Sequence, residues 1–308
     1  MWQYGLVLIV ALVLTLQSLF AKLYSNHYTG EESFSSPVFS VLYGFIVAFA
    51  TLLANGFSYE PSKLTLVLGI LNGLFLFLYN YALIEGSRRG SFSFVMICNL
   101  FGGVLVVMAV MLFVPSLVEW LVGRDSSLWF EPQTFTFLQG IALIVVLVAF
   151  VLLNLKGGNQ ERPKRLYYLF ALLLGIVNGG YGAVLALQSA LRPDDRAEVL
   201  ITTFFFGGLF SLLYLFVIGK KRALSHFRMS PKAWGFAVGA CLIAALAANL
   251  LTTVLGMFEN AAIVNSTVNG GILIFSALSS RILFGERMNK IQWIGALLCV
   301  ISLVLLNF

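Results

Sequence analysis

The chain has 308 residues, of which 60% are hydrophobic and only 10% are charged. A soluble protein is about 45–50% apolar and about 25% charged, so this composition excludes an ordinary soluble domain. Apolar runs of about 18 residues or more recur along the whole sequence and predict a polytopic membrane protein. The formal net charge of +6 is spread over short loops, which offer no folded basic face, so no nucleic-acid partner is expected.

Ten transmembrane helices are predicted from the apolar runs and the polar or charged breaks between them. The first run has no basic segment before it and no small-residue cleavage site, so we interpret it as a retained helix and not a signal peptide. Each run is long enough to cross a hydrocarbon core about 30 Å thick. The predicted spans are 3–24, 34–57, 64–85, 90–114, 133–155, 166–190, 197–218, 233–257, 261–283 and 288–307.

Basic residues are unevenly distributed among the connections. The odd connections (first to second helix, third to fourth, and so on) hold 15 of the 19 lysines and arginines. Because basic loops favour the cytoplasm, this bias predicts that the odd connections are cytoplasmic and that both termini lie outside. The expected location is a bacterial inner (plasma) membrane.

The two halves of the chain show an internal repeat. LTLQS at 14–18 returns as LALQS at 185–189, an offset of 171 positions, and several further pairs keep nearly the same offset. An insertion near 115–129 would account for the shorter offset at the end of each half. The repeat predicts two five-helix units, 1–156 and 157–308, within one integral membrane domain. Five is odd, so the second unit is inverted relative to the first, an arrangement suited to alternating access. The pairs near this offset are Gly69 with Gly239, Asn80 with Asn249 and Asn99 with Asn269, and those at the shorter offset are Glu131 with Glu286 and Gly140 with Gly295.

The last two predicted helices carry a family resemblance. The segment LSSRILFGERMNKIQWIGALLCVISLVLL at 278–306, with its FGE turn, resembles the ten-helix EamA-like branch of the drug/metabolite transporter superfamily. The first half departs from this pattern, with FEP at 130–132 in place of FGE. The resemblance implies transport of a small metabolite without naming it. Many relatives have cytoplasmic termini, so the resemblance implies the opposite orientation to the one that the charge bias predicts. We retain the orientation predicted by the charge bias.

Amide and phenol side chains in the apolar helices are the candidate substrate-binding residues. Polar groups in hydrocarbon are costly unless they face protein or water. The polar side chains occur in matched helices of both halves, whereas the fifth and tenth helices have almost none. One central polar cavity is therefore expected. The alternative is that these side chains form hydrogen bonds between helices. The candidates are Gln17, Asn72, Tyr79, Asn99, Asn178, Tyr181, Gln188, Asn249 and Asn269.

Glycine pairs and charged residues complete the expectations for the membrane region. Small-xxx-small pairs predict close helix packing at 69/73, 175/179 and 235/239. No charged residue lies in the middle of a predicted helix. Glu85 is expected to be an interfacial cap or a solvated charge, with proton coupling as the alternative if it faces the cavity, and Lys22 is expected to snorkel.

The favoured function is a secondary transporter of a small polar or amphipathic metabolite, such as an amino-acid-like solute. The alternatives are a lipid-linked solute flippase and a non-transporting receptor or structural membrane protein. An enzyme is not expected, because the sequence lacks HExxH and GxSxG motifs. No cofactor or metal site is expected, since the three cysteines have no metal-ligand spacing. The expected partners are a small-molecule substrate and the lipid bilayer; a coupling ion and the oligomeric state stay open.

Overall fold

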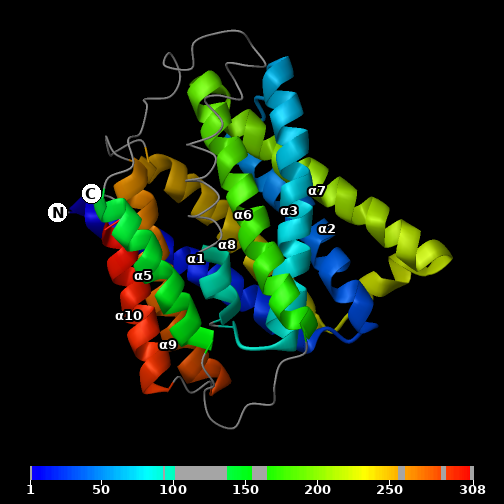
Figure 1. Cartoon of the computed structure of the whole chain (residues 1–308). Coiled ribbons are helices and arrows are strands. Elements are labelled where there is room, and N and C mark those ends of the chain that lie inside the picture. The colour runs from blue at the N-terminus through cyan, green and yellow to red at the C-terminus, as the bar shows by residue number, and fades with distance from the viewer. Residues whose placement is uncertain are drawn as a thin grey trace.

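The computed structural model describes residues 2–92, 94–100, 137–154, 165–255, 261–285 and 289–305, and within them the regular structure is entirely helical (Figure 1). Three short 3-10 helices, Glu32–Phe34, Pro193–Asp195 and Lys220–Phe227, lie between the longer elements. Residues 94–100 are helical as well. The α-helices are α1 (Trp2–His27), α2 (Ser35–Ala54), α3 (Lys63–Arg89), α5 (Phe137–Asn154), α6 (Arg165–Leu191), α7 (Arg196–Gly219), α8 (Pro231–Leu255), α9 (Ala261–Phe284) and α10 (Lys290–Leu305).

Each of these α-helices coincides with one predicted span to within a few residues. The predicted span 90–114 is described only in its first part, and the predicted insertion at 115–129 lies outside the described residues. Among the described helices, six are long and apolar enough to cross a membrane: α1, α2 together with the short helix before it, α3, α6, α7 and α8. The chain is an integral membrane protein with an all-helical fold.

The outer surface of the bundle is apolar. Val217 and Ile282 are 73% and 77% exposed, and leucines, isoleucines and phenylalanines on most helices share this exposure. Contiguous exposed apolar surface of this extent is unfavourable in water and is matched by lipid chains. The interior, in contrast, includes buried amides, hydroxyls and one carboxylate.

Helix packing joins the first and second halves of the chain throughout. Helix α2 packs against α7, α1 against α8, α3 against α6 and α7, and α2 against α8. Helices α5 and α10 pack against each other at one edge of the bundle, next to α9 (Figure 1). The two halves therefore interleave and do not form two separate lobes.

Glycines permit the closest of these approaches. A Cβ atom on Gly44 of α2 would overlap the backbone of Gly208 in α7, and one on Gly73 of α3 would lie 2.9 Å from the backbone nitrogen of Gly207. The predicted close packing at 69/73 is thus confirmed. At the 235/239 pair only Gly239 packs tightly, against the Phe20 ring at 2.7 Å, whereas Gly235 has no neighbour within 4 Å.

Contacts among the connections define two ends of the bundle. The α1–α2 connection contacts the α7–α8 connection, because the Tyr28 hydroxyl donates to the backbone oxygen of His226 at 3.0 Å. The α2–α3 connection contacts the α6–α7 connection, because the Ser62 backbone N–H donates to Asp195 at 3.2 Å. We call these the odd end and the even end, after the connections that meet there.

Local signals set the helix boundaries at both ends. The Ser62 hydroxyl accepts from the Thr65 backbone N–H at 3.2 Å and caps the start of α3. Gly285 follows α9 with a φ of +65°, a left-handed conformation that glycine adopts without the steric penalty of a side chain. This residue is the glycine of the FGE turn.

Candidate functional site

A polar cluster lies inside the bundle where α1, α2, α3, α6 and the 94–100 helix meet. The Gln17 amide donates to the Tyr43 hydroxyl at 3.1 Å. The Asn99 amide donates to the Tyr79 hydroxyl at 3.3 Å, and the Asn178 amide donates to the backbone oxygen of Asn99 at 3.2 Å. These hydrogen bonds tie together residues that are far apart in the sequence, four of which were candidate site residues.

Three tyrosines lie in the same core as these hydrogen-bonded groups. Tyr43 is buried in that core, and Tyr79 and Tyr181 pack against it. The cluster therefore presents phenol and amide groups from both halves of the chain and contains no charged side chain. Such groups donate and accept hydrogen bonds, which suits a polar solute with no strong net charge.

Several buried amide atoms at or near this cluster have no hydrogen-bond partner among the described residues. They are both amide atoms of Asn72 and the amide oxygen of Asn99. Asn72 shares a face of α3 with Tyr79, two helical turns away. A buried polar atom left unpaired costs about 1–3 kcal/mol, so these amides favour the binding of a polar partner.

The described hydrogen bonds of two further candidates, Gln188 and Asn249, run to backbone oxygens and not to the cluster residues. Gln188 is buried but donates to the backbone oxygens of Arg192 at 2.7 Å and Asp195 at 3.2 Å, at the even end. Asn249 donates to its own helix at the Ala245 oxygen, 2.8 Å away. Asn269 is half-buried in α9. The repeated Gln-Ser pair thus places Gln17 and Gln188 in different surroundings, and the side chain of Ser189 lies outside the description.

Tyr43 is the cluster residue that the sequence analysis did not single out. It is buried in α2 and also contacts Phe204 of α7, with ring centroids 5.8 Å apart. The available signal was the pair Tyr43-Gly44 inside an otherwise apolar run. A buried tyrosine needs a hydrogen-bond partner, and Gly44 marks the point where α7 approaches.

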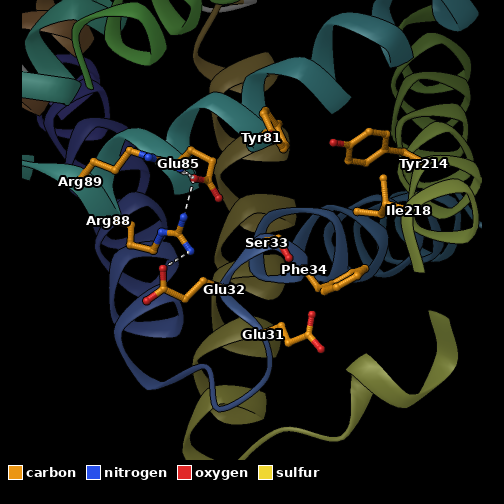
Figure 2. A pocket seen from close by; sticks show the side chains of 10 residues that line it. All are labelled: Glu31, Glu32, Ser33, Phe34, Tyr81, Glu85, Arg88, Arg89, Tyr214 and Ile218. Carbon is orange, nitrogen blue, oxygen red and sulfur yellow. Dashed lines mark hydrogen bonds and ion pairs between the residues drawn. The ribbon is translucent and has the colours of Figure 1, made fainter. Parts of the chain in front are cut away.

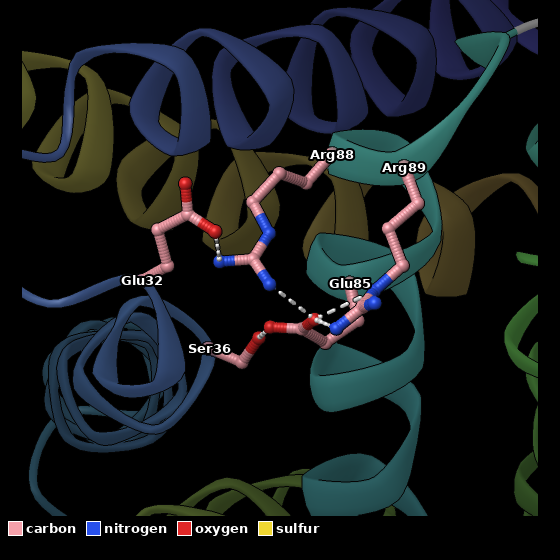
Figure 3. Close-up of polar contacts among 5 residues, drawn as sticks. All are labelled: Glu32, Ser36, Glu85, Arg88 and Arg89. Atoms are coloured by element: carbon pink, nitrogen blue, oxygen red, sulfur yellow. Dashed lines mark hydrogen bonds and ion pairs between the residues drawn. The ribbon is translucent and has the colours of Figure 1, made fainter. Parts of the chain in front are cut away.

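Glu85 forms an ion network at the odd end (Figure 3). Its carboxylate accepts from Arg88 at 2.7 Å and from Arg89 at 2.8 Å, and the Ser36 hydroxyl donates to it at 3.1 Å. Arg88 also contacts Glu32 at 3.3 Å. Only 2% of Glu85 is exposed, so the expectation of a solvated charge was wrong: the α1–α2 connection covers the end of α3 and buries it.

Lys22 also departs from its expected position. It does not snorkel, because only 7% of it is exposed. Its ammonium lies 4.0 Å from the centre of the Phe284 ring and 5.4 Å from that of Phe92. This is cation–π geometry, and it joins the ends of α1 and α9.

A pocket of about 580 Å³ opens beside this network (Figure 2). It lies among the end of α3, the end of α7 and the short helix before α2. Its position is separate from the polar cluster, since Tyr81 and Glu85 lie about 120–160° around α3 from Tyr79. The lining residues are Glu31, Glu32, Ser33, Phe34, Tyr81, Glu85, Arg88, Arg89, Tyr214 and Ile218.

Two groups in the connections have shifted acidities. Hydrogen bonds from Thr65 and then Ser62 lower the pKa of Asp195 at the even end. At the odd end, burial and then the nearby charge of Glu31 raise the pKa of Tyr28 to about 12. Within the part of the chain that the structure describes, no three His, Cys, Asp or Glu side chains gather as metal ligands.

Comparisons with known proteins show the fold, and they match the second half of the chain to one family model. One solved structure, titled only as the crystal structure of a protein, is similar with a TM-score of 0.57 over 96% of this chain and 94% of that chain. At 15% identity this likeness shows a shared fold alone. Among curated proteins, none matches the sequence. Residues 165–308 match the model of the EamA-like transporter family.

Proposed function

We propose that the chain is a secondary transporter of a small polar or amphipathic metabolite. Residues 165–308 match the model of the EamA-like transporter family, part of the drug/metabolite transporter superfamily, and this match supports the proposal. Members of this family are transporters and not enzymes. The observation that carries the proposal is the hydrogen-bonded cluster of Gln17, Tyr43, Tyr79, Asn99 and Asn178 inside an otherwise apolar bundle.

The chemistry of the cluster supports an uncharged or zwitterionic solute, for example an amino-acid-like one. Amide groups offer donors and acceptors together, and aromatic rings offer apolar faces. A strongly anionic solute would need a cation beside it, and none of the hydrogen bonds of this cluster involves a charged side chain. Asn72 and Asn99 supply buried amide atoms that such a solute could satisfy.

Alternating access is part of the proposal and rests on the pattern of helix contacts. Two inverted repeats would make each of the first five helices equivalent to the helix five places later. The packing of α1 against α8 would then be equivalent to that of α6 against α3. The packing of α3 against α7 would likewise be equivalent to that of α8 against α2. All four of these contacts are present. The α2–α7 and α5–α10 pairs each correspond to themselves and are present too. This pairing supports ten helices in two inverted repeats, 1–156 and 157–308.

The proposed orientation follows the basic connections. We place the odd end in the cytoplasm of a bacterial cell and both termini outside. Ser225 is exposed in the basic α7–α8 connection, and Glu60 is exposed at the even end. A cysteine at 225 should resist an impermeant thiol reagent added to intact cells, while a cysteine at 60 should react. The opposite pattern would reverse the orientation.

A lipid-linked flippase is the weaker alternative. Such a protein requires a charged head-group site along its path through the bilayer. The charged residues that α3 contributes to the pocket lie in the last two turns of this helix. They are Glu85 and the two arginines that pair with it, Arg88 and Arg89. Their position at the end of the bundle favours a soluble solute over a lipid head group.

The test is transport by the purified protein in liposomes, loaded with a panel of amino acids and related metabolites. For the solute that is transported, Asn178→Leu and Tyr43→Phe should weaken binding about 5- to 150-fold, because each removes a hydrogen-bonding group. Tyr214→Phe is the matched control, since Tyr214 lies outside the cluster. Loss of folding in both variants, or unchanged transport in both, would reject the cluster as the binding site.

A further inference from the structure

The pocket at the odd end has the size of a small-molecule site, and its lining combines charged side chains with aromatic rings. Its volume of about 580 Å³ falls within the roughly 300–1,000 Å³ typical of ligand pockets. Glu31 and Glu32 lie on one side of it, and Tyr81 and Tyr214 lie on the other (Figure 2). The polar cluster proposed for transport contributes no residue to this pocket.

The charges that line the pocket do not balance. Three carboxylates, Glu31, Glu32 and Glu85, face two arginines, Arg88 and Arg89, which leaves one net negative charge. Both arginines are held by Glu85, and Arg88 also contacts Glu32. The carboxylate of Glu31 makes no hydrogen bond or ion pair with any described residue, and no dashed line reaches it in Figure 2.

Aromatic rings form the apolar part of the pocket. Tyr81 and Tyr214 meet edge to face with their centroids 5.9 Å apart. Phe34 is held rigidly, because its ring stacks on His226 with a centroid distance of 3.6 Å and an interplanar angle of 8°. Fixed rings beside an unpaired carboxylate favour a cation that carries an apolar group, since the ring faces attract positive charge.

We propose that this pocket binds an organic cation, an amine or quaternary ammonium group attached to an apolar body. Glu31 holds the positive group, and Phe34, Tyr81 and Tyr214 hold the apolar body. An anion is disfavoured, because Glu85 and Glu32 already occupy the two arginines. The site is distinct from the polar cluster, and its occupation does not depend on whether the chain transports a solute.

The experiment is a calorimetric titration of the purified full-length chain in non-ionic detergent with benzyltrimethylammonium. Benzyl alcohol and benzenesulfonate serve as neutral and anionic probes of similar size. We expect the cation to bind and the other two not to bind. We also expect binding to weaken as sodium chloride is raised, because salt screens an exposed carboxylate.

The residues are tested by three variants. Glu31→Gln should weaken binding of the cation about 5- to 30-fold, and Tyr214→Leu should weaken it by a similar factor. Glu60→Gln, an exposed glutamate at the even end, is the matched control and should leave binding unchanged. Glu31 is exposed, so its variant should keep the wild-type melting temperature.

Three outcomes would overturn the proposal. They are no heat of binding with the cation, equal binding of all three probes, and unchanged affinity in Glu31→Gln. If Tyr43→Phe weakens the cation while Glu31→Gln does not, the cation occupies the polar cluster instead. Failure of this binding test leaves the transport proposal untouched, and failure of transport leaves this site untouched.

Discussion

The two ends of the bundle are held together by corresponding connections but by different chemistry. At the even end, Thr65 donates to Asp195 at 2.6 Å and the Tyr59 hydroxyl lies 2.9 Å from that of Thr202. At the odd end, Tyr28 donates to the backbone of His226, and Ser230 donates to the backbone of His27 at 3.0 Å. Each end joins one connection from each half of the chain. Under the proposed inversion the two ends are equivalent: the α2–α3 connection of the even end corresponds to the α7–α8 connection of the odd end, and the α6–α7 connection corresponds to the α1–α2 connection.

The odd end differs because it also contains a buried carboxylate. Glu85 and its two arginines have no counterpart among the even-end contacts described here, where Asp195 lies in an exposed connection. A buried charge network is strongly destabilised when one partner is removed, whereas an exposed contact contributes little. The two ends can therefore be destabilised separately, each by a substitution of its own.

The largest effect is expected for Glu85→Leu at the odd end. Removing the carboxylate leaves Arg89 without an ion pair and Arg88 with only the exposed Glu32, which should lower the free energy of unfolding by up to about 3–5 kcal/mol. Thermal unfolding in detergent measures this, with Ser36→Ala as a control that removes only one donor. A melting temperature that stays within a degree of wild type would show that the network does not stabilise the odd end.

A substitution at the contact between α2 and α7 affects both ends together. Gly44→Ala should destabilise the protein by about 1–3 kcal/mol, because the new methyl group overlaps the backbone of Gly208. Gly235→Ala is the matched control, since nothing lies within 4 Å of its Cβ position. Alanine favours a helix over glycine by up to about 1 kcal/mol, so the control should be neutral or stabilising. Equal losses in both variants would contradict the close approach of α2 and α7.

The even end should contribute a pH-dependent part of the stability through Asp195. The folded-state pKa of Asp195 is lowered by its hydrogen bonds to Thr65 and Ser62, so its contribution is present above the unfolded-state pKa and is lost as the pH falls through the folded-state pKa. Asp195→Asn should cost at most about 1 kcal/mol at neutral pH, because the group is only partly buried and solvent screens its contacts. The gap between variant and wild type should close in acid, as melting curves from pH 7 to pH 3 would show. A constant gap would reject this contact.

The smallest effect is expected for Glu32→Gln. Its side chain is 85% exposed, and its ion pair with Arg88 spans 3.3 Å. Exposed ion pairs contribute about 0–1 kcal/mol, so the melting temperature should change by less than in any variant above. A loss as large as that of Glu85→Leu would mean that Glu32 and Glu85 act as one unit.

The helices could be predicted from the sequence because the apolar runs and their breaks are long and clear. The polar cluster was predicted only in part. Gln17 and Gln188 occupy equivalent places in a repeated pentapeptide, yet Gln188 lies one turn from the end of α6 and binds the backbone beyond it. A short repeat cannot show how far each copy lies from its helix end.

The environment of Glu85 could not be predicted, because it depends on a distant segment. Sequence alone places Glu85 near the end of α3, where a charge is usually solvated. Only the fold shows that Ser36, at the start of α2, donates to it and that Glu32, in the short helix before α2, pairs with its partner Arg88. Tyr43 was missed for a related reason, since its partner Gln17 is contributed by another helix.

The central claim is that the two ends open in alternation around the polar cluster. Paired spin labels in lipid nanodiscs test it most directly, with one pair at Ser33 and Leu224 across the odd end and another at Glu60 and Asp194 across the even end. All four positions are exposed. On addition of a transported solute, the account predicts that one distance lengthens while the other shortens. Two distances that stay fixed, or that lengthen together, would contradict it.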